Sequence, residues 1–162
     1  MLADHDPISL IPPTVPLPPV VLPPQAAREP ALIGRRVRVL GVEIVDTLRT
    51  RAIERIDELI DEADPRARTI FFVNAHTLNL AARDTDYRAT LNSADYVFGD
   101  GTGVRWAARL AGVRLMDNVN GTDLVPELLS TSGGRRRRYF MLGADEDTIR
   151  RAADFASQQF PQ

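Results

Sequence analysis

Two successive strand–loop–helix units dominate the middle of this sequence. Residues 70–73 (Ile-Phe-Phe-Val) form a continuous apolar run of β-branched and aromatic side chains, which is typical of a strand buried on both faces. A Leu- and Ala-rich helix follows at about residues 77–83. Residues 96–98 repeat the strand pattern, and a helix with an apolar stripe follows from about Val104 to Ala111. Strands that alternate with helices in this way predict an α/β fold, with a Rossmann-like parallel sheet flanked by helices.

The rest of the sequence from residue 34 fits the same plan. We expect a final helix over 146–160, and a helix that ends at Leu129 and is capped by Thr122 or Asp123. Further strands are expected at 37–40, 42–45 and 139–142, and further helices at 50–63 and 86–91. A single domain over residues 34–162, long enough to bury a core, accounts for these elements.

Residues 1–33 have a different composition. Nine of the 12 prolines lie within the first thirty residues, which disfavours helix and favours extended polyproline conformations. We expect a disordered, Pro-rich tail; a docking segment for a proline-recognising partner is the alternative. The tail lacks the basic start and the apolar core of a secretory signal. The sequence contains no run of about twenty apolar residues, the length that would be needed to span a membrane.

Composition narrows the possible functions. The chain has no cysteine and only two histidines, His5 and His76, so we expect neither a disulfide nor a thiolate or His-rich metal site. The formal net charge of −2 does not favour binding to nucleic acid. These features suit a cytoplasmic protein.

Polar residues stand where two of the expected strands end. Asn74 follows the first strand of the repeated units, and Asp100 follows the second between Gly99 and Gly101. The carboxyl ends of parallel strands meet at one edge, where ligands bind and helix N-termini offer free N–H groups. A carboxylate beside an anion site suits transfer from a phosphorylated donor to a hydroxyl. The structural alternative is that Asp100 only forms a turn and caps the next helix.

The run VNAHTLNLAARDTDYRATLNSADYVFGDGTGVRWAARL, with NVNGTDLVPELL and RYFMLGADEDTIRRAADFASQQFP after it, resembles the WecG/TagA/CpsF family of bacterial glycosyltransferases. The resemblance covers residues 37 to 162. It implies transfer of a sugar, typically N-acetylmannosamine, from a UDP-sugar donor to a polyprenyl-diphosphate-linked sugar, for cell-surface polysaccharide or teichoic acid. It also implies a peripheral location at the cytoplasmic face of the cell membrane.

The resemblance assigns roles to particular residues. Asp100 matches the family's general base, Asn74 its strand-end Asn, and Asp123 the acid of its Gly-x-Asp element, although Asp123 is also a candidate helix cap. An inverting displacement needs a base for the attacking hydroxyl and stabilisation of the departing diphosphate. We expect Asn74 to orient substrate hydroxyls. The N–H groups from Gly101 through Thr102 and Gly103 to Val104 would face phosphate, so no cofactor or metal is expected.

This chain also departs from the family. Phe72 stands where many members have Thr, and Asn118 where many have Arg. Members continue beyond the point matched by residue 162, so we expect the front part of the enzyme, weakly active and prone to self-association. A non-catalytic remnant that binds UDP-sugar is one alternative. Another is a Rossmann-type nucleotide-binding protein, although Gly41-Val42-Glu43 fits its Gly-rich turn poorly. The run Arg135–Arg138 is either a solvated loop or a contact with anionic lipid.

Overall fold

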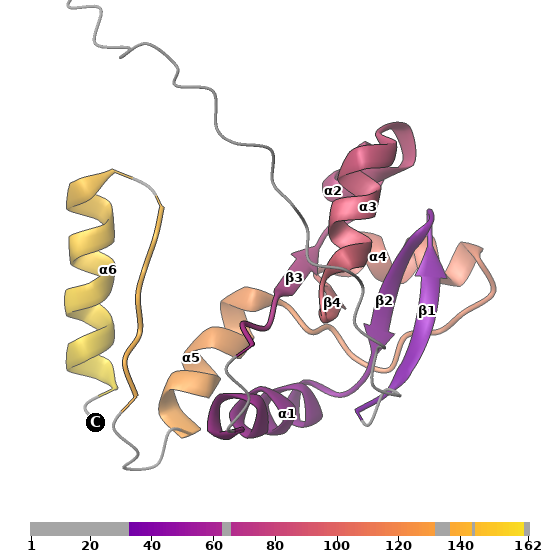
Figure 1. Ribbon diagram of the computed structural model, residues 1–162. Helices are drawn as coiled ribbons and strands as arrows, with labels where there is room; N and C mark the ends of the chain where they lie inside the picture. Colours follow the sequence, from indigo (N-terminus) through magenta and orange to yellow (C-terminus); the bar gives the residue numbers. More distant parts are fainter. Residues whose placement is uncertain (1–32, 63–65, 132–136, 144, 161–162) are drawn as a thin grey trace, which may run out of the picture.

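A computed structural model describes residues 33–62, 66–131, 137–143 and 145–160. All but the last residue of the expected Pro-rich tail therefore lie outside the described residues. Within them, the order of elements follows the expected alternation of strands and helices (Figure 1). The elements are β1 (Arg35–Val39), β2 (Val42–Asp46), α1 (Arg49–Asp61), β3 (Ile70–Val73), α2 (Ala75–Arg83), α3 (Thr85–Ser93), β4 (Tyr96–Gly99), α4 (Thr102–Leu110), α5 (Gly121–Thr131) and α6 (Glu146–Gln159).

Strands β3 and β4 form the parallel sheet that the sequence predicts. They pair in parallel, with Ile70 opposite Tyr96 and Val73 opposite Gly99. Helices α2 and α3 make the crossover between them, as a parallel pair requires. The expectation of a mixed α/β fold with a parallel sheet flanked by helices is confirmed, and among the described residues that sheet has two strands.

The first two strands correct one part of this expectation. β1 and β2 pair antiparallel as a hairpin, with Val39 opposite Val42, instead of joining a parallel ladder. Leu40 and Gly41 form the tight turn, both with positive φ (48° and 84°). A dinucleotide-binding unit needs a helix directly after its first strand. The hairpin therefore leaves no room for that motif at β1.

Side chains alternate between the two faces of the β3–β4 sheet and build a separate apolar cluster on each. Val73 and Val97 pack on one face with residues of α2, α3 and α4, such as Leu78 and Val104. Phe98 and Phe72 pack on the other face with α1 and α5. The domain is therefore a three-layer α/β/α arrangement (Figure 1), in which β2 runs alongside β4 and contributes to both clusters.

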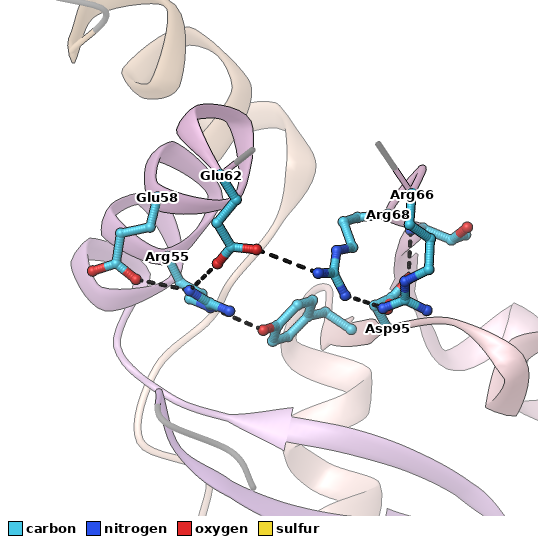
Figure 2. A network of polar contacts seen from close by, with 8 residues as sticks. Arg55, Glu58, Glu62, Arg66, Arg68 and Asp95 are labelled. Carbon is cyan, nitrogen blue, oxygen red and sulfur yellow. Dashed lines mark hydrogen bonds and ion pairs between the residues drawn. The ribbon is translucent and has the colours of Figure 1, made fainter. Parts of the chain in front are cut away.

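A network of ion pairs fixes the amino-terminal end of this sheet (Figure 2). The buried guanidinium of Arg55 on α1 donates to the hydroxyl of Tyr96 at 3.1 Å. It also donates to carboxylates of α1 and the residue after it, Glu58 at 3.0 Å and Glu62 at 2.9 Å. Figure 2 shows the network continuing through Arg68 to Asp95, which accepts from Arg66 and from the backbone N–H of Thr69. These contacts lie at the end of β3 and β4 opposite to Asn74 and Asp100.

The C-terminal part departs from the sequence expectation. The expected strand at 139–142 is wrong: residues 137–143 have no strand partner among the described residues. Phe140 and Leu142 are 89% and 90% exposed, so the apolar pattern is present without a sheet to cover it. Helix α6 forms nearly as expected, but none of its residues is buried, and in Figure 1 it lies to one side beyond α5.

Candidate active site at the carboxyl ends of β3 and β4

The parallel register brings Asn74 and Asp100 to neighbouring positions. Val73 pairs with Gly99, so the next residue of each strand lies at the same edge of the sheet. The backbone N–H of Asp100 donates to the carbonyl of Val73 at 2.8 Å, which extends the ladder one step beyond the strands. The two polar residues predicted to share one edge of the sheet therefore do so.

Asn74 is the N-cap of α2. Its Oδ1 accepts from the backbone N–H of Thr77 at 3.0 Å, and the Thr77 hydroxyl accepts from the Asn74 N–H at 2.8 Å. This capping box starts the helix at Ala75, two residues earlier than expected. The Nδ2 group of Asn74 makes no hydrogen bond with any residue that the structure describes, and the side chain is exposed. Asn74 can therefore cap α2 and still donate to a ligand.

Asp100 does not have the capping role that the turn-and-cap alternative assigns to it. Helix α4 begins at Thr102, with Gly101 at its N-cap position and no side-chain cap. Gly101 has a φ of 91°, a conformation that glycine adopts without strain. Within the described residues no group donates to the half-buried carboxylate of Asp100. Its oxygens are available to accept a proton or a hydroxyl hydrogen bond.

The N-termini of α2 and α4 converge beside this carboxylate. Gly103 lies so close to α2 that a Cβ there would stand 2.7 Å from the Cβ of Ala75. The absence of a side chain at position 103 thus permits the approach. First-turn N–H groups have no partner inside their own helix, and both helix dipoles are positive at these ends. This edge of the sheet is suited to an anionic group such as a phosphate.

Asn118 organises the loop at the start of α4, which sequence reasoning missed. Its Oδ1 accepts from the backbone N–H of Gly101 at 2.6 Å. The expectation that the Gly101 N–H faces phosphate is therefore wrong, because this donor is already bound. The N–H groups of Thr102, Gly103 and Val104 remain at the helix start. The sequence signal for Asn118 was its place among Asn and Asp residues, which often bind backbone N–H groups.

The expected cap of α5 is also corrected. Asn120, and not Thr122 or Asp123, precedes the helix, and its Oδ1 accepts from the backbone N–H of Asp123 at 2.8 Å. The Asp123 carboxylate accepts from Asn120 Nδ2 at 2.9 Å and from Arg49 at 3.1 Å. Asp123 thus links α5 to α1 and forms no hydrogen bond with Asp100 or Asn74 among the described residues. Gly121 places the start of α5 against the ring of Phe72.

Asp117 completes the loop by capping α1 from a distance. Leu48 occupies the N-cap position of α1 and has no side-chain acceptor, so Asp117 Oδ2 accepts from the Arg49 N–H at 3.0 Å. Its other oxygen accepts from the N–H of Asn118 at 2.7 Å. The hydrogen bond from Arg49 is the main reason that the pKa of Asp117 is lowered. The residues around 117–123 therefore connect the starts of α1, α4 and α5.

The other sequence candidates lie in different settings. His76 is an exposed residue in the first turn of α2, at the same edge as Asn74. Arg135 and Arg136 lie outside the described residues. The side chain of Arg137 is only 7% exposed, where a solvated loop was expected, and it forms ion pairs with Asp57 and Asp61 of α1.

A separate hollow of about 670 Å³ lies between residues 137–141 and α6. Its apolar lining includes Phe140 and Phe160, and it includes neither Asp100 nor Asn74. No group of three or more potential metal ligands occurs in the described part of the chain. No helix there is long and apolar enough to cross a membrane.

Parallel strands whose polar ends face converging helix N-termini define the class of α/β proteins that bind phosphorylated ligands at the carboxyl edge of the sheet. Comparison with known proteins identifies the family. Residues 37–162 match the family described as Glycosyl transferase WecG/TagA/CpsF, and the chain belongs to this family. The resemblance drawn from the sequence motifs is confirmed.

Two curated relatives illustrate the match, and both carry the name N-acetylglucosaminyldiphosphoundecaprenol N-acetyl-beta-D-mannosaminyltransferase. The protein of Bacillus subtilis (strain 168) is 33% identical over 89 residues, which is 55% of this chain and 35% of the relative. The protein of Staphylococcus aureus (strain NCTC 8325 / PS 47) is 28% identical over 124 residues, which is 76% of this chain and 48% of the relative. The matched regions thus span about a third to a half of these relatives' length.

Proposed function

We propose that this chain provides the base and the donor-phosphate site of a glycosyltransferase. The donor is a UDP-sugar, N-acetylmannosamine being the sugar named in the relatives, and the acceptor is a polyprenyl-diphosphate-linked sugar. Family membership supports the reaction class. The observation that carries the proposal is the position of Asp100, whose carboxylate has no protein partner among the described residues and stands beside the starts of two helices.

In the proposed reaction, a hydroxyl oxygen of the acceptor attacks the anomeric carbon of the donor sugar. The bond from that carbon to the diphosphate oxygen breaks, and UDP departs with the bonding electron pair. The hydroxyl proton passes to the Asp100 carboxylate as the new bond forms. A single displacement of this kind inverts the anomeric configuration.

The departing diphosphate gains negative charge, which the protein must stabilise. The N–H groups at the start of α4, from Thr102 to Val104, are suited to this role, since the helix dipole adds positive potential there. Asn74 Nδ2 is free to donate to a sugar hydroxyl or to a phosphate oxygen. Asp123 is not assigned a step in this scheme, because its Oδ2 already accepts from Arg49 and Asn120.

The test is Asp100→Asn, which keeps the size of the side chain and removes its basicity. We expect transfer to fall by about 100-fold or more while the affinity for UDP stays within about twofold of the parent, since general bases typically contribute about 10²–10⁴ in rate. Asp84→Asn is a matched control, because Asp84 only caps α3. Equal turnover by the Asp100 variant and the parent would refute the assignment of the base.

Titration of the parent protein with UDP and with NAD, beside the transfer assay, separates the alternative functions. UDP binding by the parent without measurable transfer would favour a binding protein over an enzyme. Binding of NAD in preference to UDP would favour a dinucleotide-binding protein. Either result would contradict the proposed reaction.

A further inference from the structure

Helix α4 has two different faces. Val104 and Ala108 point into the core and have no exposed surface. The opposite face carries Trp106 and Leu110, one helical turn apart and 67% and 89% exposed. The inner face fixes α4 to the domain, while the outer face leaves two large apolar side chains in water.

Basic residues flank this apolar pair. Arg105 and Arg109 are exposed and one turn apart on the same helix, and Arg114 follows in the next loop. From residue 101 to residue 116 the chain has three arginines and no Asp or Glu, although the net charge of the whole chain is −2. No carboxylate of the described residues forms an ion pair with Arg105 or Arg109.

This combination of side chains fits the boundary between lipid and water. Tryptophan and leucine enter the zone beneath the headgroups, and arginines extend along the apolar surface toward phosphate. A protein partner would have to provide carboxylates for the arginines beside a pocket for the apolar pair. An anionic lipid surface provides phosphates and an apolar layer together along the whole helix, which is about 13 Å long. We infer that the outer face of α4, defined by Arg105, Trp106, Arg109 and Leu110, docks on an anionic phospholipid surface.

The position of α4 connects this membrane contact with the candidate active site, and this part of the inference rests on the proposed function. The helix begins two residues after Asp100, so a membrane that lies against its outer face also lies beside the carboxyl ends of β3 and β4. A lipid-linked acceptor presents its diphosphate and sugar at the same surface. Docking through α4 would therefore bring the acceptor hydroxyl to the base without extraction of the lipid.

Trp106 is the only tryptophan in the chain, so its fluorescence reports on this face directly. The full 162-residue chain is titrated with phosphatidylcholine vesicles and with vesicles that also contain phosphatidylglycerol. We expect a blue shift of the emission, and quenching by brominated acyl chains, only with the anionic vesicles. Arg109→Glu reverses the charge and should weaken this binding about 25-fold, since each unit of charge near an anionic surface contributes roughly fivefold. Leu110→Glu should weaken it as well.

Arg51→Glu is the matched control, because Arg51 is an exposed arginine of α1 on the opposite layer. Vesicle affinity of this variant should remain within about twofold of the parent. Three results would overturn the inference: no shift with anionic vesicles, an equal loss in the Arg51 and Arg109 variants, or a shift that appears with protein concentration alone, which would mean that a second copy covers the face. UDP affinity measured in the same samples tests the proposed function separately, since it does not require a membrane.

Discussion

The hydrogen bond from Gly101 to Asn118 allows a sharp test of how the candidate site is built. Asn118→Ala removes the acceptor and leaves the Gly101 N–H to water, because both residues are only half-buried. A neutral hydrogen bond contributes about 0.5–1.5 kcal/mol net, so we expect a loss of about 1 kcal/mol in the free energy of unfolding. For a domain of this size the melting temperature should fall by about 4 °C.

The same change should act on ligand binding. Asn118 holds the loop that leads from Asp100 into α4, so its loss frees the first-turn N–H groups from a fixed arrangement. If UDP binding requires the fixed arrangement, the variant must order the loop when it binds. The free energy of the lost hydrogen bond, about 0.5–1.5 kcal/mol, then weakens UDP binding by about twofold to tenfold. Isothermal titration of UDP measures this directly and needs no acceptor.

Asn92→Ala is the matched control. Asn92, a residue of α3, also anchors a turn, but this turn is the β1–β2 hairpin: it accepts from the Glu43 N–H and donates to the Gly41 carbonyl, both at 2.9 Å. We expect this variant to lose about 2 kcal/mol of stability or more, since at least these two bonds are removed, and to keep its affinity for UDP. The reasoning fails if the Asn118 variant binds UDP as the parent does, or if both variants lose affinity equally.

Two further predictions concern the same edge of the sheet. Gly103→Ala should weaken UDP binding and cost about 1–2 kcal/mol of stability by thermal denaturation, because the new methyl group meets Ala75 at 2.7 Å; unchanged affinity would show that α2 and α4 need not touch. Asp117→Asn should destabilise the protein at pH 6, and the deficit should disappear as the pH falls through and below about 4. The lowered pKa of Asp117 contributes stability above its unfolded-state value of about 3.9, and this contribution is lost as the pH falls through the lower folded-state pKa; a deficit that does not shrink below about pH 3.9 in a pH series of melting curves would contradict this.

The local sequence pattern was sufficient to predict those helices and strands whose formation depends mainly on neighbouring residues. The strand at residues 70–73 has the expected bounds because a short run of β-branched and aromatic residues favours a strand, although only Val73 is fully buried. Helix α6 begins where expected because Asp145 caps it. Joint placement of Asn74 and Asp100 followed from a general property of parallel sheets, which needs no detailed coordinates.

Features that depend on distant partners could not be predicted in the same way. Residues 139–142 have a strand pattern, yet a strand also requires a neighbour to pair with, and local sequence does not provide one. The contact between Asn118 and Gly101 joins residues 17 apart, and Asp117 caps a helix that begins 68 residues earlier. Nothing in the local pattern around these residues specifies such partners.

The two strand-end residues show how structural and chemical roles can be separated. A helix cap uses the side-chain oxygen that chemistry would need, and the sequence offered Asp100 as a candidate for either role. Asn74 does cap its helix, but an amide has a second polar group, and Nδ2 forms no hydrogen bond with the described part of the chain. Asp100 has no such second group, but its helix begins at the next residue but one, and the N-cap residue Gly101 has no side chain that could cap it. Asn118, from another loop, fixes the Gly101 N–H, while no described residue donates to the Asp100 carboxylate, which is therefore available to accept a proton.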